Sequence, residues 1–374
     1  MKRYILALII LLNIVLAYSE DYTQIDKQSE TVPANLKTPS EIAHYLTQNL
    51  TLPTDKTRAI YYWISHNIRY DIKKLNSGKT YNNPQEILDE VMQYRQGVCQ
   101  HYAELFHACC ESVGVESYVI SGYTNQTGEL GNLSHAWNAV LINGKFYEVD
   151  VTWAAGHLIN RKYIHEFADL YFLISPSEFI KSHIPYDPIW QFLNNPITHK
   201  DFQKSNFSKL KTSSNFNFND SIKLLSHLNL LEKTIRENNR IRHSGITNDQ
   251  LQKQVAFNQQ IIITEKLNTA VNLYNKGVED YNVYIFNKNK QFQDKNVTEK
   301  QLLGFLSTAR RQVESAERLL NFLNSDNSNL NKQISDMQKS IVKMKNDIKN
   351  EDNFMEKYRN TLKPVRIFLF TTGK

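Results

Sequence analysis

Residues 97–114 read GVCQHYAELFHACCESVG and contain all three cysteines of the 374-residue chain. Their apolar residues recur at the spacing of one helix face and a typical C-cap glycine follows, so the segment predicts a helix from about Cys99 to Val113. Cys99 then lies in the first turn, where unpaired backbone N–H groups and the helix dipole stabilise a thiolate. We expect Gly97 to allow a sharp turn into the helix and to leave room for a substrate at the sulfur.

The other two cysteines are interpreted as packing residues. Cys109 and Cys110 lie on the apolar stripe of the predicted helix, and free cysteine behaves as a small hydrophobic residue. Cys110 lies roughly 16 Å along the helix axis from Cys99, too far for a disulfide. A cysteine near a helix start is also compatible with a structural role, so position alone does not make Cys99 a nucleophile.

A β-hairpin is predicted for residues 134–153, SHAWNAVLINGKFYEVDVTW. The dipeptide Asn143-Gly144 between two strand-like runs is the strongest signal for a two-residue type I′ turn. Such a turn pairs Ile142 with Lys145 and sets the register of both strands, because side chains alternate between the two faces of a strand.

This register brings a histidine beside a carboxylate. It sets Asp150 opposite Trp137 and Thr152 opposite His135, so that His135 and Asp150 are diagonal neighbours on one face. A carboxylate bonded to one imidazole nitrogen leaves the other nitrogen free to exchange a proton with a thiol. Cys99, His135 and Asp150 therefore predict the nucleophile, the acid/base and the orienting acid of a cysteine hydrolase. The structural alternatives are a surface position for His135 and a strand-end cap for Asp150.

The two halves of the chain differ in charge and in periodicity. Residues 1–200 carry 16 Lys and Arg against 20 Asp and Glu, whereas residues 201–374 carry 28 against 18. Strand and helix periods are mixed from about residue 22 to 196, and residues 221–362 are helical throughout. The lysines of the second half are scattered among Asn and Gln, so a solvated helix surface is favoured over a patch for nucleic acid or membranes.

Heptad spacing in the second half predicts an antiparallel pair of helices joined by the polar turn NSDNSN. Thr298-Glu-Lys-Gln301 is typical of a capping box for the first helix. The apolar positions are Leu302, Leu306, Ala309, Val313, Ala316, Leu320 and Leu323 in one helix and Leu330, Ile334, Met337, Ile341, Met344 and Ile348 in the other.

The first residues, MKRYILALIILLNIVLAYSED, are typical of a secretory signal. Two basic residues precede an apolar run from Tyr4 to Ala17, and cleavage is expected after Ala17 or Ser19. The run is shorter than the roughly 20 residues that span a bilayer, which favours export over a permanent anchor. We therefore expect a periplasmic, cell-surface or secreted protein, in which three cysteines are too few for a disulfide framework.

Residues 97–124, residues 134–153 and the upstream segment AIYYWISHNIRYD, residues 59–71, together resemble the transglutaminase-like superfamily, whose members share a papain-like core. The pattern is most similar to the secreted bacterial branch related to kyphoscoliosis-peptidase and cytokinesis proteins. Residues 171–193, YFLISPSEFIKSHIPYDPIWQFL, are similar to the tail that often closes that domain. The resemblance spans about residues 40–195.

The resemblance implies an α+β fold in which the helix bearing the cysteine packs on an antiparallel sheet, followed by an all-α bundle or coiled coil. The expected parts are a signal peptide in residues 1–19, a transglutaminase-like domain in 20–200, a linker in 201–220 and a helical domain in 221–374.

The resemblance also implies roles for individual residues. Cys99 is the expected nucleophile of an acyl-thioester mechanism, and its backbone N–H is the expected first oxyanion donor. Asn67 or Tyr70 is a candidate side-chain donor. Trp137 and Trp153 are expected to wall the cleft, while His101 points away from Cys99 on the helix and is given no role.

The expected function is hydrolysis of a protein or peptide amide, or transfer of the acyl group, without a cofactor. Cys99, His135 and Asp150 lack the spacing of a zinc motif, so no metal is expected. Hydrolysis is favoured over cross-linking because an open cleft admits water, and neither nucleic acid nor a stable membrane span is expected. The alternative is a non-catalytic binding or scaffolding protein whose helical domain mediates oligomerisation or contacts a surface partner.

Overall fold

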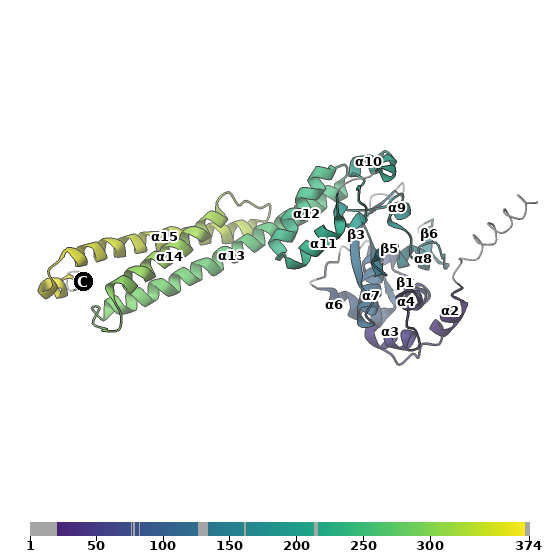
Figure 1. The fold of residues 1–374 in the computed structure, drawn as a ribbon, viewed down its shortest axis with the longest axis horizontal. Helices are drawn as coiled ribbons and strands as arrows, with labels where there is room; N and C mark the ends of the chain where they lie inside the picture. Colours follow the sequence, from purple (N-terminus) through teal and green to yellow (C-terminus); the bar gives the residue numbers. More distant parts are fainter. Residues whose placement is uncertain are drawn as a thin grey trace, which may run out of the picture. The chain divides into compact units, whose positions relative to one another are not determined.

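The computed structural model describes residues 21–370 except 76, 78, 82, 126–133, 161 and 213–215. These residues form two compact units (Figure 1). The first extends to Leu224 and includes Arg240–Gln252, and the second comprises Leu225–Asn239 and the chain from Lys253 onward. The expected signal peptide lies outside the described residues.

The first unit combines many short helices with three small sheets, and its helices lie mostly before and after the strands. In chain order they are α2 (Thr23–Ser29), α3 (Pro39–Thr47), α4 (Pro53–Asn67), α5 (Ile72–Leu75), α6 (Pro84–Tyr94), α7 (Cys99–Ser112), α8 (Val151–Ala155), α9 (Pro176–Phe179), the 3-10 helix η2 (Pro188–Gln191), α10 (His199–Gln203), the 3-10 helix η3 (Ser208–Lys211) and α11 (Phe218–His227).

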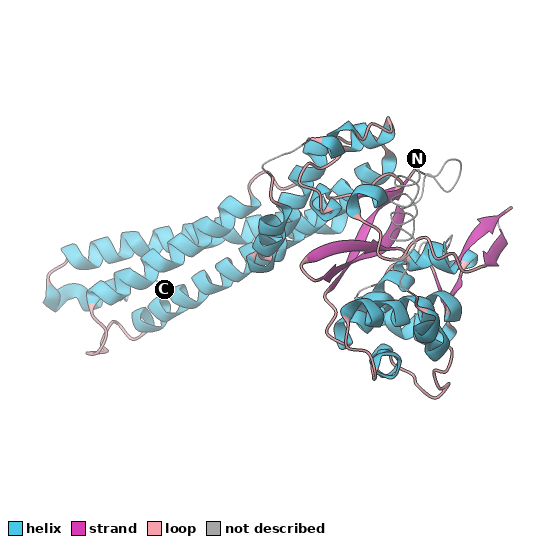
Figure 2. Ribbon diagram, turned by 45° about the vertical axis from the view of Figure 1, so that its right-hand side comes forward, coloured by secondary structure: helices cyan, strands magenta, loops and turns pink. Residues whose placement is uncertain are grey.

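The main sheet is antiparallel and has the strand order β5-β4-β3-β8 (Figure 2). Its strands are β3 (Ser117–Thr124), β4 (Ser134–Ile142), β5 (Lys145–Val149) and β8 (His183–Pro185). Ile142 pairs with Lys145 and Asn138 with Val149, which confirms the register predicted from the Asn143-Gly144 turn.

Helix α7 packs on one face of this sheet. Its buried side chains, including Phe106, Cys109 and Cys110, share a core with Val140 and Val149 of the sheet. This confirms the packing role of the two cysteines and the α+β fold. Alternate residues such as Trp137 and Phe146 face a second core on the other side of the sheet, as the period of two requires.

Two smaller sheets flank the start of α7 and the end of α8. β1 (Arg69–Tyr70) runs parallel to β2 (Gln96–Gly97) and pairs Tyr70 with Gly97. β6 (Gly156–Ile159) and β7 (Lys162–His165) form a separate antiparallel hairpin directly after α8. The first of these sheets therefore brings backbone from a distant position next to Cys99, and the second lies close to Asp150 in the sequence.

Residues 201–220, expected to be a linker, contain structure of their own. Phe202 in α10 is 5% exposed, and His199 at the start of that helix is fully buried against the first unit. The compact first unit continues to Leu224, so the boundary lies later in the chain than the polar composition indicated. The buried apolar residues of this segment, such as Phe202, are too few to produce a periodic signal in the sequence.

The second unit consists mainly of long helices, with α12 (Leu230–Ser244) and α13 (Asp249–Asn289) each contributing residues to both units. α14 (Glu299–Leu320) and α15 (Ser328–Asn360) match the two predicted heptad helices, and the capping box at Thr298 is present. Ion pairs join Glu317 with Lys345 and Arg310 with Asp352, which step seven residues up one helix and down the other as in an antiparallel pair. The 3-10 helix η4 (Lys363–Phe370) follows α15.

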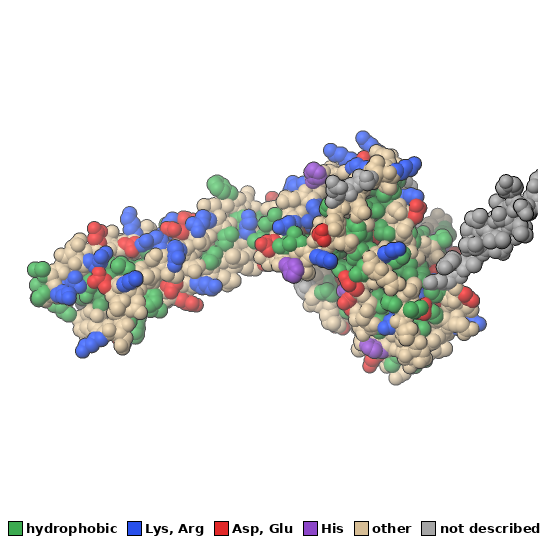
Figure 3. All heavy atoms as spheres, viewed as in Figure 1, with side chains coloured by type: hydrophobic (Ala, Val, Ile, Leu, Met, Phe, Trp, Pro, Cys, Tyr) green, Lys and Arg blue, Asp and Glu red, His purple; other side chains and the backbone are tan. Residues whose placement is uncertain are grey.

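The surface of the second unit mixes charges of both signs. On the face in view, Lys and Arg side chains are interspersed with Asp and Glu (Figure 3). This distribution favours the solvated helix surface expected from the scattered lysines. No helix among the described residues combines the length and the apolar character needed to cross a membrane.

Candidate active site

Cys99 is the first residue of α7, as the sequence predicted. Val98, the residue before it, has an extended backbone and is the N-cap of the helix. The first, unpaired N–H groups of α7 therefore lie at the same end of the helix as the Cys99 thiol. The expected role of Gly97 is wrong in one respect: a Cβ there would lie 2.4 Å from the Cβ of His101. His101 rather than open space for a substrate fills that position.

His101 holds the turn before Cys99. Its Nδ1 accepts a hydrogen bond from the Val98 backbone N–H at 3.3 Å, so its Nε2–H can donate to the hydroxyl of Tyr81 at 3.0 Å. That hydroxyl donates in turn to Glu90 at 2.8 Å. Burial, with a smaller effect of nearby lysines, lowers the pKa of His101 to about 4, so the ring is neutral at pH 7. The structure gives His101 a contact with the backbone of the turn that precedes Cys99.

His135 and Asp150 are brought together by the hairpin. The Nε2–H of His135 donates to Oδ2 of Asp150 at 2.8 Å. The predicted strand is shorter than expected, however, because β5 ends at Val149 and Thr152 lies in α8 rather than opposite His135. Asp150 is the N-cap of α8, and its Oδ1 accepts from the backbone N–H groups of Thr152 and Trp153.

A second histidine contacts the same carboxylate. His183 of β8 is 1% exposed, and its Nε2–H donates to Oδ2 of Asp150 at 3.1 Å. Its Nδ1 accepts from the Ser182 hydroxyl at 2.8 Å, and its ring stacks on Phe179 at 4.1 Å. The sequence analysis missed His183 because it lies 33 residues after Asp150. Its only signal was a histidine in the tail motif that resembled the closing segment of the domain.

The three polar side chains perturb one another's pKa values. Burial acts to raise the pKa of Asp150, but His135 and then His183 outweigh it, and the pKa lies well below its ordinary value. For His135, burial acts to lower the pKa. Asp150 and the hydrogen bond with Cys99 outweigh that effect and raise the pKa to about 10. Burial lowers the pKa of His183 to about 4, so His183 is a neutral donor. The arrangement therefore favours an ionised Asp150 beside a protonated His135.

The thiol of Cys99 is the remaining partner of the His135 ring. Cys99 lies near enough to the His135 ring to raise its pKa, and Nε2 of His135 is already engaged by Asp150, which leaves the other ring nitrogen for the sulfur. The order thiol, imidazole and carboxylate is the one that nucleophilic cysteine chemistry needs.

The other predicted site residues divide into two groups. Tyr70 lines the cavity beside His135, whereas Asn67 is exposed and its side-chain amide donates to the Trp63 carbonyl of its own helix. Trp153 also lines this cavity. The expectation for Trp137 is wrong, because β8 and Phe179 cover it: its ring is 1% exposed and its N–H donates to buried Glu148.

Among the described residues, His135, Asp150 and His183 form the one group of three that could hold a metal ion, with ligand atoms within 4.8 Å of one another. Both Nε2–H groups point at the same carboxylate oxygen, so a metal would have to replace two hydrogen bonds in a buried place. The polar atoms of this group are satisfied without a metal. The zinc site considered from the sequence consisted of Cys99, His135 and Asp150, whereas this group contains His183 instead of Cys99.

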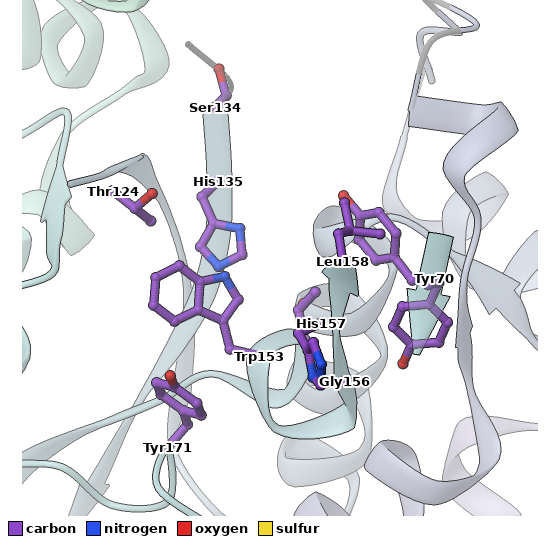
Figure 4. Close-up of a pocket in the computed structure, with 11 residues that line it drawn as sticks. Tyr70, Thr124, Ser134, His135, Trp153, Gly156, His157, Leu158 and Tyr171 are labelled. Atoms are coloured by element: carbon purple, nitrogen blue, oxygen red, sulfur yellow. The ribbon is translucent and has the colours of Figure 1, made fainter. Parts of the chain in front are cut away.

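The cavity beside His135 has a volume of about 240 Å³. Figure 4 shows His135, Ser134 and Trp153 on one side of it and Tyr70 and Leu158 on the other. Such a cavity next to the candidate acid/base is where a substrate side chain would lie.

Comparisons with known proteins show what part of the first unit is similar to. Residues 40–151 match the model of the transglutaminase-like superfamily. Human kyphoscoliosis peptidase is 33% identical over 178 residues, which cover 45% of this chain and 26% of that protein. Hillarin of Drosophila melanogaster is 28% identical over 193 residues, 46% of this chain and 23% of hillarin.

Among solved structures, the periplasmic domain of TgpA from Pseudomonas aeruginosa is similar at 18% identity and a TM-score of 0.26. The match covers 36% of this chain and 49% of that one. The chain spans about a quarter of the length of the curated relatives it matches.

Proposed function

We propose that the transglutaminase-like core carried by residues 40–151 is the catalytic part of an exported cysteine-dependent amide hydrolase or acyltransferase. The observation that carries this proposal is the hydrogen bond from His135 to Asp150, together with the effect of nearby Cys99 on the pKa of His135. The substrate class we propose is a protein or peptide amide. Export rests on the apolar run from Tyr4 to Ala17 and is part of the proposal.

The proposed reaction begins with attack of the Cys99 thiolate on the amide carbonyl carbon, which forms a tetrahedral oxyanion. The backbone N–H of Cys99, at the start of α7, is one proposed donor to this oxygen, and the Tyr70 hydroxyl is the other. Protonated His135 gives its proton to the amide nitrogen as the carbon–nitrogen bond breaks, and the amine leaves.

The second half of the proposed reaction releases the acyl group from the thioester. Neutral His135 takes a proton from water, whose oxygen attacks the thioester carbon, and Cys99 leaves as the thiolate. An amine in place of water would give acyl transfer. We favour hydrolysis because the cleft admits water. Asp150 remains ionised throughout and orients the His135 ring.

Alkylation by iodoacetamide near neutral pH tests the activated thiol. We expect one modified cysteine per chain, because Cys109 and Cys110 are fully buried, and no modification in Cys99→Ala. His135→Gln should slow the alkylation about tenfold or more by removing the imidazolium. A Cys99 that reacts at the same rate in His135→Gln as in the unaltered chain contradicts the proposal.

The binding-module alternative makes the opposite prediction for the cell. If the core only recognises a partner, Cys99→Ala should retain the cellular function while deletion of residues 253–374, which leaves the first unit whole, abolishes it. If the core is an enzyme, Cys99→Ala should behave like a deletion of the gene while the protein remains folded and present at normal levels.

A further inference from the structure

The cavity beside His135 is sized for a single side chain. Its volume of about 240 Å³ is below the roughly 300–1,000 Å³ of pockets that enclose a whole small ligand. Tyr70 lies on β1 and pairs with Gly97, two residues before Cys99. His135 lines the cavity and lies near enough to Cys99 for Cys99 to raise its pKa. A side chain in the cavity would therefore belong to a residue at the bond that Cys99 attacks.

The lining of this cavity is largely aromatic, and it includes the protonated ring of His135. None of the described lining residues is Lys, Arg, Asp or Glu, and its polar groups are hydroxyls, imidazoles, an indole N–H and backbone. A cationic side chain would lose its hydration there without gaining an anionic partner. The apolar contacts come from Tyr70, Trp153, Leu158, Tyr163 and Tyr171.

The wall formed by the β6–β7 hairpin is held in place before any substrate binds. A Cβ on Gly156 would lie 2.2 Å from the Ile164 carbonyl oxygen, so glycine permits the close approach of the two strands. The Tyr163 hydroxyl donates to the Ala155 carbonyl at 2.9 Å, and the His165 Nε2–H donates to the Ser65 carbonyl at 2.8 Å. These contacts tie the hairpin to α8 and to α4.

We infer that this cavity is the specificity subsite of the site and accepts an aromatic or large apolar side chain next to the scissile amide. The inference rests on the proposed function and names its substrate class. Trp153 and Leu158 supply apolar contact area, and the absence of a carboxylate among the described lining residues disfavours Lys and Arg side chains.

Labelling of the full chain by peptidyl acyloxymethyl ketones tests the subsite, with Phe or Lys as the residue beside the ketone. The Phe probe should modify Cys99 at least about tenfold faster than the Lys probe. Leu158→Asp places a carboxylate in the cavity and should reverse the order of the Phe and Lys probes. The matched control is Ile159→Asp, because Ile159 follows on the same strand, is 51% exposed and does not line the cavity.

A binding measurement keeps this test separate from catalysis. Calorimetry with full-chain Cys99→Ala should show about tenfold tighter binding of a blocked pentapeptide amide with a central Phe than of the same peptide with Lys. Equal affinities, or equal effects of Leu158→Asp and Ile159→Asp, overturn the subsite. A Cys99 that iodoacetamide does not modify overturns the proposed chemistry, while the peptide affinities still decide the subsite.

Discussion

At the scale of single residues, Asp150 combines two contacts that were alternatives in the sequence. Its carboxylate caps α8 through Oδ1 and accepts from His135 and His183 through Oδ2. Any substitution of Asp150 therefore disturbs the helix and the imidazole together. His183 is the better residue for testing the role of the carboxylate. Its side chain donates to Asp150, and its other hydrogen-bond partner is Ser182.

Replacing His183 by Leu should lower kcat/KM about tenfold, because Asp150 loses one of four donors and orients His135 less well. The negative charge of Asp150 would then act more strongly on His135, so the pH midpoint of activity assigned to His135 should move upward. His183→Gln keeps an N–H donor and should restore part of the rate. A rate loss with an unmoved pH midpoint in both variants would indicate a purely structural role.

The buried histidines also predict how stability depends on pH. Burial lowers the pKa values of His101, His183 and His199 to about 4. Below pH of about 6.5 the unfolded chain binds these protons and the folded chain does not, so the free energy of unfolding falls on acidification. His135 acts in the opposite direction: its pKa of about 10 gives a contribution that is complete below about 6.5 and lost as the pH rises through 10. We expect a maximum of stability near pH 6.5.

Tryptophan fluorescence can measure this maximum, because all four tryptophans lie in the first unit. On the acid side, each histidine should contribute about 1.4 kcal/mol per pH unit. His199→Gln removes one titrating group and should flatten that limb, whereas substitution of exposed His157 by Gln should not. A midpoint temperature that is constant between pH 4.5 and 6.5 would show that these rings are not neutral in the folded chain.

At the scale of elements, β2 just before α7 and the second turn of α14 contain glycines with opposite expectations. Gly97→Ala places a Cβ against His101 and should lower the free energy of unfolding by about 1–3 kcal/mol and slow alkylation of Cys99. Gly304 in α14 is exposed with open space around it, so Gly304→Ala should stabilise the second unit by about 0.5–1 kcal/mol. Circular dichroism and tryptophan fluorescence together separate the two units. Equal effects of both substitutions would contradict the steric argument.

At the scale of the whole molecule, the first unit is discontinuous in sequence. An ion pair joins its later segment, in α12, to the earlier one. Arg240 donates to both oxygens of Asp187, at 2.6 and 2.7 Å, and Asp187 is 5% exposed. Residues 240–252 therefore belong to the first unit, although residues 225–239 of the second unit separate them from it in the sequence.

Arg240→Ala should destabilise the first unit by about 2–3 kcal/mol, because it leaves a buried carboxylate without its partner. Exposed Arg242 on the same helix is the control, and its substitution by Ala should change the unfolding midpoint little. The tryptophan fluorescence transition measures both. Equal midpoints for the two variants would mean that Asp187 is adequately solvated without Arg240.

Much of the fold follows from short-range signals in the sequence. The Asn143-Gly144 turn determined the hairpin register, the apolar period and Gly114 determined α7, and heptads with the Thr298 cap determined α14 and α15. Each signal acts over a few residues, since turn geometry, capping and side-chain periodicity are local properties of the backbone. The pairing of His135 with Asp150 belongs to this group because one hairpin carries both residues.

Tertiary structure alone decided the contacts between segments that lie far apart in the chain. His183 reaches Asp150 because β8 pairs with the edge of β3 that faces away from β4. Tyr70 reaches the cavity because β1 pairs with β2. The coverage of Trp137 by β8 and Phe179, the space filled by His101 beside Gly97 and the pair of Asp187 with Arg240 have the same origin. The strand order of a sheet and the packing of side chains around it depend on the whole unit, so no local pattern encodes them.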